Sequence, residues 1–206
     1  TPHLALLAAA LICATQPVHA KVLPEDRADV LWHVYDGGGV TIQGPSVLVR
    51  KAYKDKVSVW GNYYVDMISG ASIDVVATAS EYSEERREVS AGLDYLHDKT
   101  NMGVGVTRST ESDYEATTVR VSVSQDFFSD LTTLSIGYAY GDDVVRRNGD
   151  DTWSDTATHQ SWRIEVSQIL SRRILMNASW EAVVDSGYLN NPYRSVRFLD
   201  NGSELG

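Results

Sequence analysis

The hydrophobic residues of this chain repeat with a period of two, and that period constrains the fold more than any other feature. At Val119 to Ser124, valines occupy every second position and alternate with Arg120, Ser122 and Ser124. Successive side chains of a β-strand point to opposite faces of a sheet, so this pattern predicts strands with one apolar face and one small or polar face. The alternation recurs in residues 89–95, 102–107, 133–140, 162–167 and 174–181.

The predicted strands are about nine to eleven residues long, the length that a tilted strand needs to cross a bilayer, whereas strands of soluble domains are usually about five or six. The connections also alternate in length. We expect tight turns near residues 54–55, 98–99, 127–130 and 171–173, and long acidic loops over 68–88, 108–117, 141–160 and from 185 onward. Short turns at one rim and long loops at the other are typical of outer-membrane barrels.

The sequence therefore predicts an all-β protein, an antiparallel up-and-down transmembrane β-barrel. Residues 28–35 and 40–51 supply a first pair of strands joined by Gly37-Gly38-Gly39, which brings the count to about nine. A single-chain bacterial barrel has an even number of strands and must close, because unpaired edges cannot be hydrated in lipid. We expect residues 21–206 to be the N-terminal part of a single barrel domain, incomplete because its C-terminal strands are missing.

The first twenty residues have the character of an export signal. Residues 1–20 contain no charged side chain, Leu4 to Ala14 form an apolar core, and Val18-His19-Ala20 offers small residues for cleavage. We expect a signal peptide, clipped at its start, whose removal after Ala20 also removes Cys13. A lipid anchor on Cys13 is disfavoured because Leu11-Ile12 lacks a small residue. The predicted location is the outer membrane of a Gram-negative bacterium, and the net charge of -10 argues against a nucleic-acid partner.

The aromatic residues, mostly Tyr and Trp, are predicted to form girdles at both edges of an apolar band facing lipid. The alternative interpretation is that they fill the core of an ordinary β-sandwich. Those on the long-loop side are Tyr63, Tyr138, Tyr140, Trp162 and Trp180, and those on the short-turn side are Tyr53, Tyr95, Phe127 and Phe128.

Charged residues on the opposite, polar face of the strands are predicted to line the lumen. They are Asp94, Arg120, Arg163, Glu165 and Glu181. If the last hairpin turns about Arg172, Arg163 falls opposite Glu181, where opposite charges attract. One interpretation is a salt-bridged network that fills a small lumen, and the other is an ion-selective or substrate-selective pathway.

Candidate chemistry is sparse. Oxygen ligands for calcium could come from Asp142, Asp143, Asp150, Asp151 and Asp155, but their spacing fits no known calcium loop, and a solvated surface loop is the alternative. No catalytic motif or Cys/His metal cluster occurs, and His97 and His159 are predicted at opposite rims, where they cannot share a site. We expect no enzymatic activity and no cofactor.

Eight sequence blocks carry a resemblance to a known family. They are HVYDGGG at 33–39, GPSVLVRK at 44–51, NYYVD at 62–66, SIDV at 72–75, YSEER at 82–86, DYLHD at 94–98, SQDFF at 124–128 and NNPYRS at 190–195. Together they span nearly everything after Ala20, and the chain resembles the uncharacterised Gram-negative outer-membrane β-barrel proteins of the domain of unknown function DUF3570. The resemblance implies a barrel in the outer membrane, longer than this chain, and no catalytic residue. It also implies, weakly, an envelope redox or flavin-transfer partner.

Three functions remain after these observations. The first is a structural scaffold of the cell envelope, whose lumen or loops hold a partner. The alternative is a porin-like channel selective for small solutes or ions, which needs the same wall. The third is a barrel enzyme acting on lipid or on a substrate bound by the loops.

Overall fold

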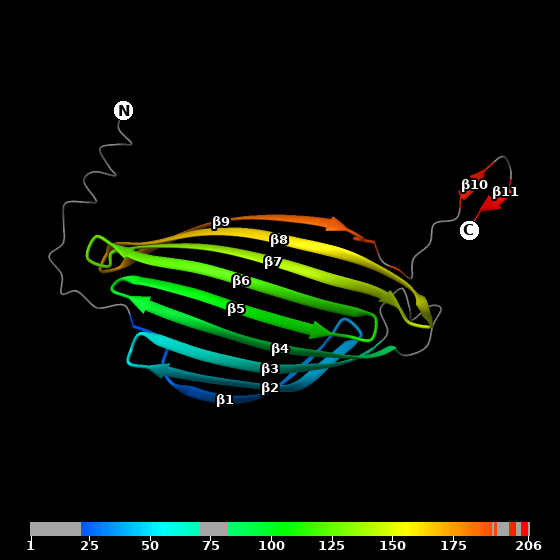
Figure 1. Cartoon of the computed structure of the whole chain (residues 1–206), viewed down its shortest axis with the longest axis horizontal. Coiled ribbons are helices and arrows are strands. Elements are labelled where there is room, and N and C mark those ends of the chain that lie inside the picture. Colours follow the sequence, from blue (N-terminus) through cyan, green and yellow to red (C-terminus); the bar gives the residue numbers. More distant parts are fainter. Residues whose placement is uncertain (1–21, 71–81, 191, 193–197, 201–202, 206) are drawn as a thin grey trace.

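A computed structural model of the chain describes residues 22–70, 82–190, 192, 198–200 and 203–205. Nine strands form one antiparallel sheet in which each strand pairs with its neighbours in sequence, as Figure 1 shows. These strands are β1 (Arg27–Gly37), β2 (Val40–Tyr53), β3 (Val57–Gly70), β4 (Tyr82–His97), β5 (Thr100–Thr110), β6 (Tyr114–Phe127), β7 (Thr132–Arg147), β8 (Asp150–Ser171) and β9 (Ile174–Gly187). A separate short pair comprises β10 (Phe198–Asp200) and β11 (Ser203–Leu205).

The predicted all-β, up-and-down architecture is confirmed. The sheet curls but does not close, because among the described strands β1 has only β2 as a partner and β9 has only β8. Within the described residues, no helix has the length and hydropathy that a membrane crossing requires.

The four predicted tight turns are confirmed, and they share one end of the sheet, which we call the tight-turn end. They span residues 54–56, 98–99, 128–131 and 172–173. Several non-glycine residues in these turns have a positive φ, among them Asp98 and Phe128, both at 52°. Bulky residues rarely occupy this left-handed region, so the pairing of the flanking strands must hold the turns in shape.

The predicted long loops at the other end, which we call the distal end, are wrong in two places. Residues 111–113 alone connect β5 to β6, and only Asn148 and Gly149 connect β7 to β8. The Thr, Tyr and Val residues in these segments favour β-structure, so backbone pairing continues where both faces of the sheet have become polar. In the predicted loop 68–88, β3 continues to Gly70 and β4 begins at Tyr82, and residues 71–81 lie outside the described residues.

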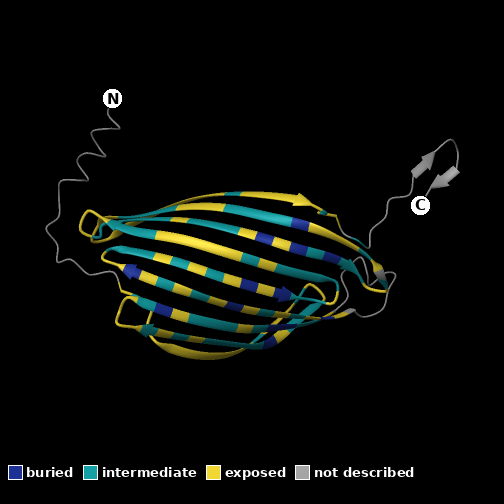
Figure 2. Ribbon diagram, viewed as in Figure 1, coloured by how far each residue is buried: buried dark blue, intermediate teal, exposed yellow. Residues whose placement is uncertain are grey.

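The burial of the two faces is the reverse of that in a soluble protein, because polar residues are buried and large apolar residues are exposed. The buried polar residues are Ser58, Asp66, Glu84, Ser90, Thr107, Ser109 and Asp143, and the register places all seven on one face, the inner face. Valines such as Val104, Val121 and Val123 lie exposed on the outer face. The alternation of buried and exposed residues is visible along β4 and β5 in Figure 2. A single sheet shields only the side toward which it curls, so the inner face lines the concave side.

The register also gives the inclination of the strands. Tyr95 lies opposite Val57, at the end of the first tight hairpin, and β4 continues two residues further to His97. Gln125 likewise lies opposite Thr100, and β6 continues two residues to Phe127. The first three tight hairpins are thus offset from one another by two residues, and the fourth is offset by three, where the pairing of β8 with β9 is irregular between Ile169 and Ser171. Two residues span about 6.6 Å along a strand, and two strands span about 9.6 Å across the sheet. If the tight turns all lie at the same height, the strands must therefore tilt by about 35° from the barrel axis. Transmembrane barrels have tilts of roughly 35–45°.

Candidate functional site on the inner face

The aromatic residues predicted as girdles fall at two levels along the strands. Tyr53, Tyr95 and Phe127 lie within two residues of a tight turn on the outer face, and Phe128 lies in a turn. The outer-face residues Tyr63, Tyr138, Tyr140, Trp162 and Trp180 lie six to nine residues from the tight-turn end of their strands. At a tilt of about 35°, each residue advances about 2.7 Å along the barrel axis, so the second level lies about 16–24 Å from the tight-turn end.

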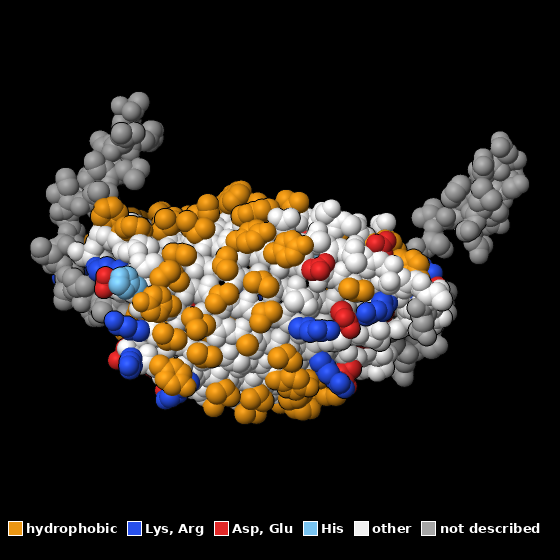
Figure 3. Space-filling view, in the orientation of Figure 1, with side chains coloured by type: hydrophobic (Ala, Val, Ile, Leu, Met, Phe, Trp, Pro, Cys, Tyr) orange, Lys and Arg blue, Asp and Glu red, His pale blue; other side chains and the backbone are white. Residues whose placement is uncertain are grey.

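The side chains between these two levels on the outer face are mostly apolar. Figure 3 shows the hydrophobic side chains as a band across the sheet, with charged side chains gathered toward either end. On β4, β5 and β7, the outer-face charges beyond the band begin at Arg87, Arg108 and Asp142, eight to ten residues from the tight turns. The distal ends of the strands therefore lie outside the apolar band.

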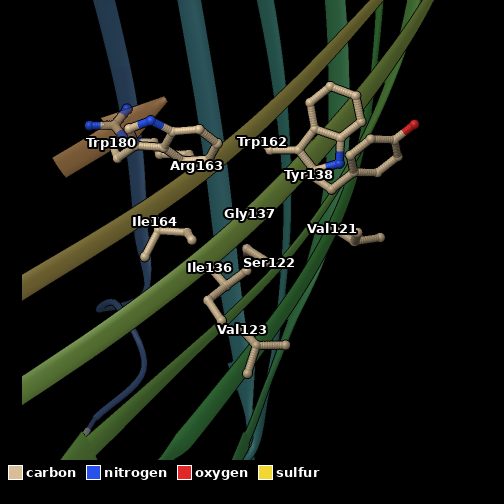
Figure 4. A pocket seen from close by; sticks show the side chains of 10 residues that line it. All are labelled: Val121, Ser122, Val123, Ile136, Gly137, Tyr138, Trp162, Arg163, Ile164 and Trp180. Atoms are coloured by element: carbon tan, nitrogen blue, oxygen red, sulfur yellow. The ribbon is translucent and has the colours of Figure 1, made fainter. Parts of the chain in front are cut away.

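An open apolar groove of about 360 Å³ lies within this band and crosses β6 to β9. Figure 4 shows the side chains around it. Its outer-face lining comprises Val121, Val123, Ile136, Tyr138, Trp162, Ile164 and Trp180. The Tyr138 and Trp162 rings are 5.5 Å apart and form one wall of the groove.

The register places all five predicted lumen residues on the inner face. One line of cross-strand partners runs from Asp94 through Gly103, Ser122 and Gly137 to Arg163 and Glu181. Arg120 and Glu165 lie two residues along their strands from members of this line and so share its face. The predicted opposition of Arg163 and Glu181 is present in the register, but the ion pair of Arg163 is with Glu165, at 3.5 Å.

Asp94 belongs to a cluster at the tight-turn end of the inner face. The Arg50 guanidinium donates hydrogen bonds to Asp94 Oδ2 at 2.6 Å and to Ser58 Oγ at 3.1 Å. It also lies 5.8 Å from the centre of the Trp60 ring, within cation–π range. The indole covers Gly92, where a Cβ atom would come within 2.5 Å of Trp60 Cζ2. Glycine at this position therefore lets the ring lie flat against the wall.

Sequence reasoning missed Arg50 and Trp60. The available signal was that both residues occupy polar-face positions of their strands. In addition, Gly92 on β4 lies opposite Trp60, and Gly105 on β5 lies opposite Gly92, which leaves room for the large ring. That signal becomes usable only once the register is known.

A histidine centre lies near the distal end of β1 to β3. His33 Nε2 lies 2.8 Å from Asp66 Oδ1 and 3.2 Å from the Tyr64 hydroxyl, and the His33 and Tyr64 rings stack at 4.7 Å. Gly44 lies opposite His33 on the intervening strand β2. His33 thus reaches across β2, at the position of Gly44, to the carboxylate on β3.

Ion pairs continue this polar inner surface onto β4 and β5. Arg86, opposite Asp66, donates to Glu88 at 2.9 Å and to Ser109 at 3.0 Å, and lies 3.9 Å from Glu111. These contacts link the His33 centre to the neighbouring strands.

A second histidine centre joins β6, β7, β8 and β9 at the distal end. His159 Nε2 lies 2.8 Å from Asp143 Oδ2, and His159 Nδ1 lies 2.7 Å from Asp185 Oδ1. The Tyr114 hydroxyl donates to the same oxygen of Asp143. His159 lies twelve residues from Ser171 and Tyr114 lies thirteen from Phe127, so the centre is beyond the apolar band.

The electrostatics of this second centre follow from its partners. The hydrogen bond to Asp185 raises the pKa of His159 above its ordinary value, while burial opposes the rise and Asp143 adds to it. Burial, with the hydrogen bond to Asp143, raises the pKa of the Tyr114 hydroxyl. Tyr114 is therefore a hydrogen-bond donor to the nearly buried Asp143 throughout the neutral range.

The aspartates considered as calcium ligands do not share the single long loop in which the sequence placed them. Asp142 and Asp143 lie on opposite faces of β7, and Asp150, Asp151 and Asp155 belong to β8. Asp143 is engaged with Tyr114 and His159, and Asp150 accepts hydrogen bonds from Thr152. Across the described residues, no group of three or more His, Cys, Asp or Glu side chains could hold a metal ion. The segment pairs as a hairpin, which separates the carboxylates.

The predicted separation of His97 from His159 agrees with the structure, since His97 ends β4 at the tight-turn end. The unexpected feature is that His33 and His159 both have carboxylate partners on the inner face, near the distal end.

A family model described as "Protein of unknown function (DUF3570)" matches residues 74–162. This match confirms the resemblance inferred from the sequence blocks over that range, which includes β4 to β7 and the first part of β8. No curated protein and no solved structure matches the chain.

Proposed function

We propose that this chain forms part of the wall of an outer-membrane β-barrel that acts as a scaffold of the cell envelope, with lipid on its outer face and a partner held by its polar interior or its distal end. The observation that supports this proposal is the inverted burial: large apolar side chains are exposed on the outer face while Asp66, Glu84 and Asp143 are buried on the inner face. Soluble monomers rarely expose a continuous apolar surface of more than a few hundred Å².

The free edges of β1 and β9 support a closed wall with further strands. In lipid, every backbone N–H and C=O group must be paired. Strands β1 and β9 run in the same direction, since eight antiparallel steps separate them, and pairing them directly would create a parallel contact. Antiparallel closure therefore takes an odd number of additional strands, which makes the total even, as in bacterial barrels.

The scaffold is favoured over a channel because several arginines of the inner face are held by carboxylates of the same face. Arg50 pairs with Asp94, Arg86 with Glu88, and Arg163 with Glu165. Such pairs fix the side chains against the wall, as a structural interior requires. The proposal assigns the chain no catalysis and, following the family resemblance, names an envelope redox or flavin-transfer protein as the partner to test first.

A selective channel remains the second candidate because of small residues on the inner face. Gly103, Gly105, Gly137 and Ala139 leave space between Arg120 and the strands on either side. Discrete conductance in a planar bilayer containing the full-length protein, with a selectivity altered by Arg120→Gln, would establish this alternative over the scaffold. A silent bilayer would leave the scaffold as the better account.

The lipid-facing assignment is tested by tryptophan quenching. Full-length variants that retain only Trp60, only Trp162 or only Trp180, with the other tryptophans replaced by Phe, are reconstituted in vesicles containing lipids brominated near the headgroup end of the acyl chain. Bromine quenches an indole that it contacts, so Trp162 and Trp180 are expected to lose fluorescence and the inner-face Trp60 to keep it. Equal quenching of all three would contradict the assignment of the faces.

A further inference from the structure

We propose that His159 is a pH-sensitive clasp that fastens strand β9 to the inner face of the sheet, beyond the apolar band. The proposal goes beyond the scaffold function, because it concerns how the distal end of β9 is held and released. It rests on the geometry of three side chains, Asp143, His159 and Asp185, on three adjacent strands.

The protonation state follows from the contacts. Both ring nitrogens of His159 lie within 2.8 Å of a carboxylate oxygen, one on β7 and one on β9. A neutral imidazole has one N–H group and one lone pair, so it can donate to only one of the two carboxylates. Only the imidazolium satisfies both, and the closed clasp is therefore the protonated form.

The two carboxylates differ in what happens when the proton leaves. The side chain of Asp143 is 5 % exposed, whereas that of Asp185 is 40 % exposed. A buried carboxylate without a donor is costly, while an exposed one is hydrated. Neutral His159 is therefore expected to keep its N–H on Asp143, which Tyr114 also supports from β6, and to release Asp185.

The release acts near the distal end of β9. Asp185 lies two residues before β9 ends at Gly187. Beyond that point Tyr188 donates its N–H to the Thr156 carbonyl at 2.9 Å, and its ring lies 5.0 Å from that of Trp153. Opening the clasp therefore loosens the distal end of β9, next to these contacts.

The charged groups around His159 are mostly acidic and come from each neighbouring strand. Tyr114 on β6, Asp143 on β7 and Asp185 on β9 face it, and the nearest charged inner-face residues along β8 are Asp155 and Arg163. Arg163 already pairs with Glu165, and Glu111 lies near Tyr114. This setting favours the cation, in agreement with the raised pKa of His159. The clasp is therefore closed at low pH and opens as pH rises through that value.

Hydrogen exchange of the full-length protein in lipid vesicles tests the clasp. Protection factors for the β9 amides, which remove the intrinsic pH dependence of exchange, are compared between pH 6 and pH 9. Loss of one charge-assisted hydrogen bond predicts protection about tenfold lower at pH 9 for residues 183–186. In Asp185→Asn and His159→Gln, these residues should be loose at both pH values. Protection that does not change with pH, or a wild-type response in Asp185→Asn, would overturn the proposal.

A control variant and a direct measurement separate the clasp from a general loss of structure. His33→Gln removes the other inner-face histidine, which has one carboxylate partner, and should leave the β9 response to pH unchanged. If the response disappears in His33→Gln, His159 is not its origin. Nitrogen NMR of labelled His159 should show both ring nitrogens protonated at pH 6 and one of them deprotonated at pH 9, and a neutral tautomer at pH 6 would refute the clasp without any mutation.

Discussion

Replacing Gly44 with alanine should destabilise the sheet more than the same change at any inner-face glycine with open space around it. A Cβ atom at Gly44 would lie 2.8 Å from the carbonyl carbon of Val65, and closer still to its oxygen. These are backbone atoms of the neighbouring strand, so no side-chain rotation can relieve the contact. Strands β2 and β3 would have to separate locally.

The expected magnitude has two parts. Inserting a group into a packed position typically costs about 1–3 kcal/mol, and a backbone contact belongs at the upper end of that range. His33 also reaches Asp66 across Gly44, and loss of a hydrogen bond to a charged group costs about 1.5–3 kcal/mol. We therefore expect Gly44→Ala to lower the free energy of unfolding by about 4.5–6 kcal/mol.

Denaturant titration of the full-length protein in lipid vesicles, followed by tryptophan fluorescence, measures this change. The matched control is Gly137→Ala, also on the inner face, where the nearest atom to a Cβ would be 3.9 Å away. Alanine there should change the free energy of unfolding by less than about 1 kcal/mol. Equal transition midpoints for the two variants would refute the argument from close approach.

Three further predictions concern the charged and titratable groups of the inner face. Asp94→Asn leaves the part-buried Arg50 without its carboxylate and should cost about 3 kcal/mol, whereas Glu165→Gln in the exposed Arg163 pair should cost less than about 1 kcal/mol by the same titration. The pKa of His159 is raised in the folded protein, so the stability that His159 contributes should be complete below about pH 6.5 and be lost as pH rises through the raised value. The melting temperature measured from pH 6 to 9 should therefore depend less on pH in His159→Gln than in the wild type. Tyr114 should remain protonated through pH 10, near the ordinary tyrosine pKa, and so give no phenolate absorbance at 295 nm. Difference spectra between the wild type and Tyr114→Phe measure this absorbance, and an ordinary tyrosine titration curve would contradict the hydrogen bond to Asp143.

The alternation of residues was sufficient to predict the strands and their faces. Val119, Val121 and Val123 lie outward and Arg120 lies inward because side-chain direction follows from the strand alone. The tight turns could also be predicted, since polar residues interrupt the apolar alternation at Asp98 and at Arg172. Local sequence carries this information, and no knowledge of the neighbouring strand is needed.

The clusters could not be predicted because they depend on register between strands. His33 meets Asp66 across Gly44 of the intervening strand, and both histidine centres join residues 16 or more positions apart in the chain. The length of β7 and β8 was also missed, because beyond the apolar band the alternation loses its hydrophobic signal. The Asn148-Gly149 pair was the available indication of a hairpin there.

The two-residue offset between the first three tight hairpins has a consequence for the width of the closed cylinder. At a tilt of about 35° each strand occupies about 5.9 Å of circumference, and the nine strands together span about 53 Å. Every extra hairpin then adds about 4 Å to the backbone diameter. The internal diameter of the barrel is thus determined by the strand offset and the number of strands. The arginines and carboxylates of the inner face determine only how much of that space their side chains fill.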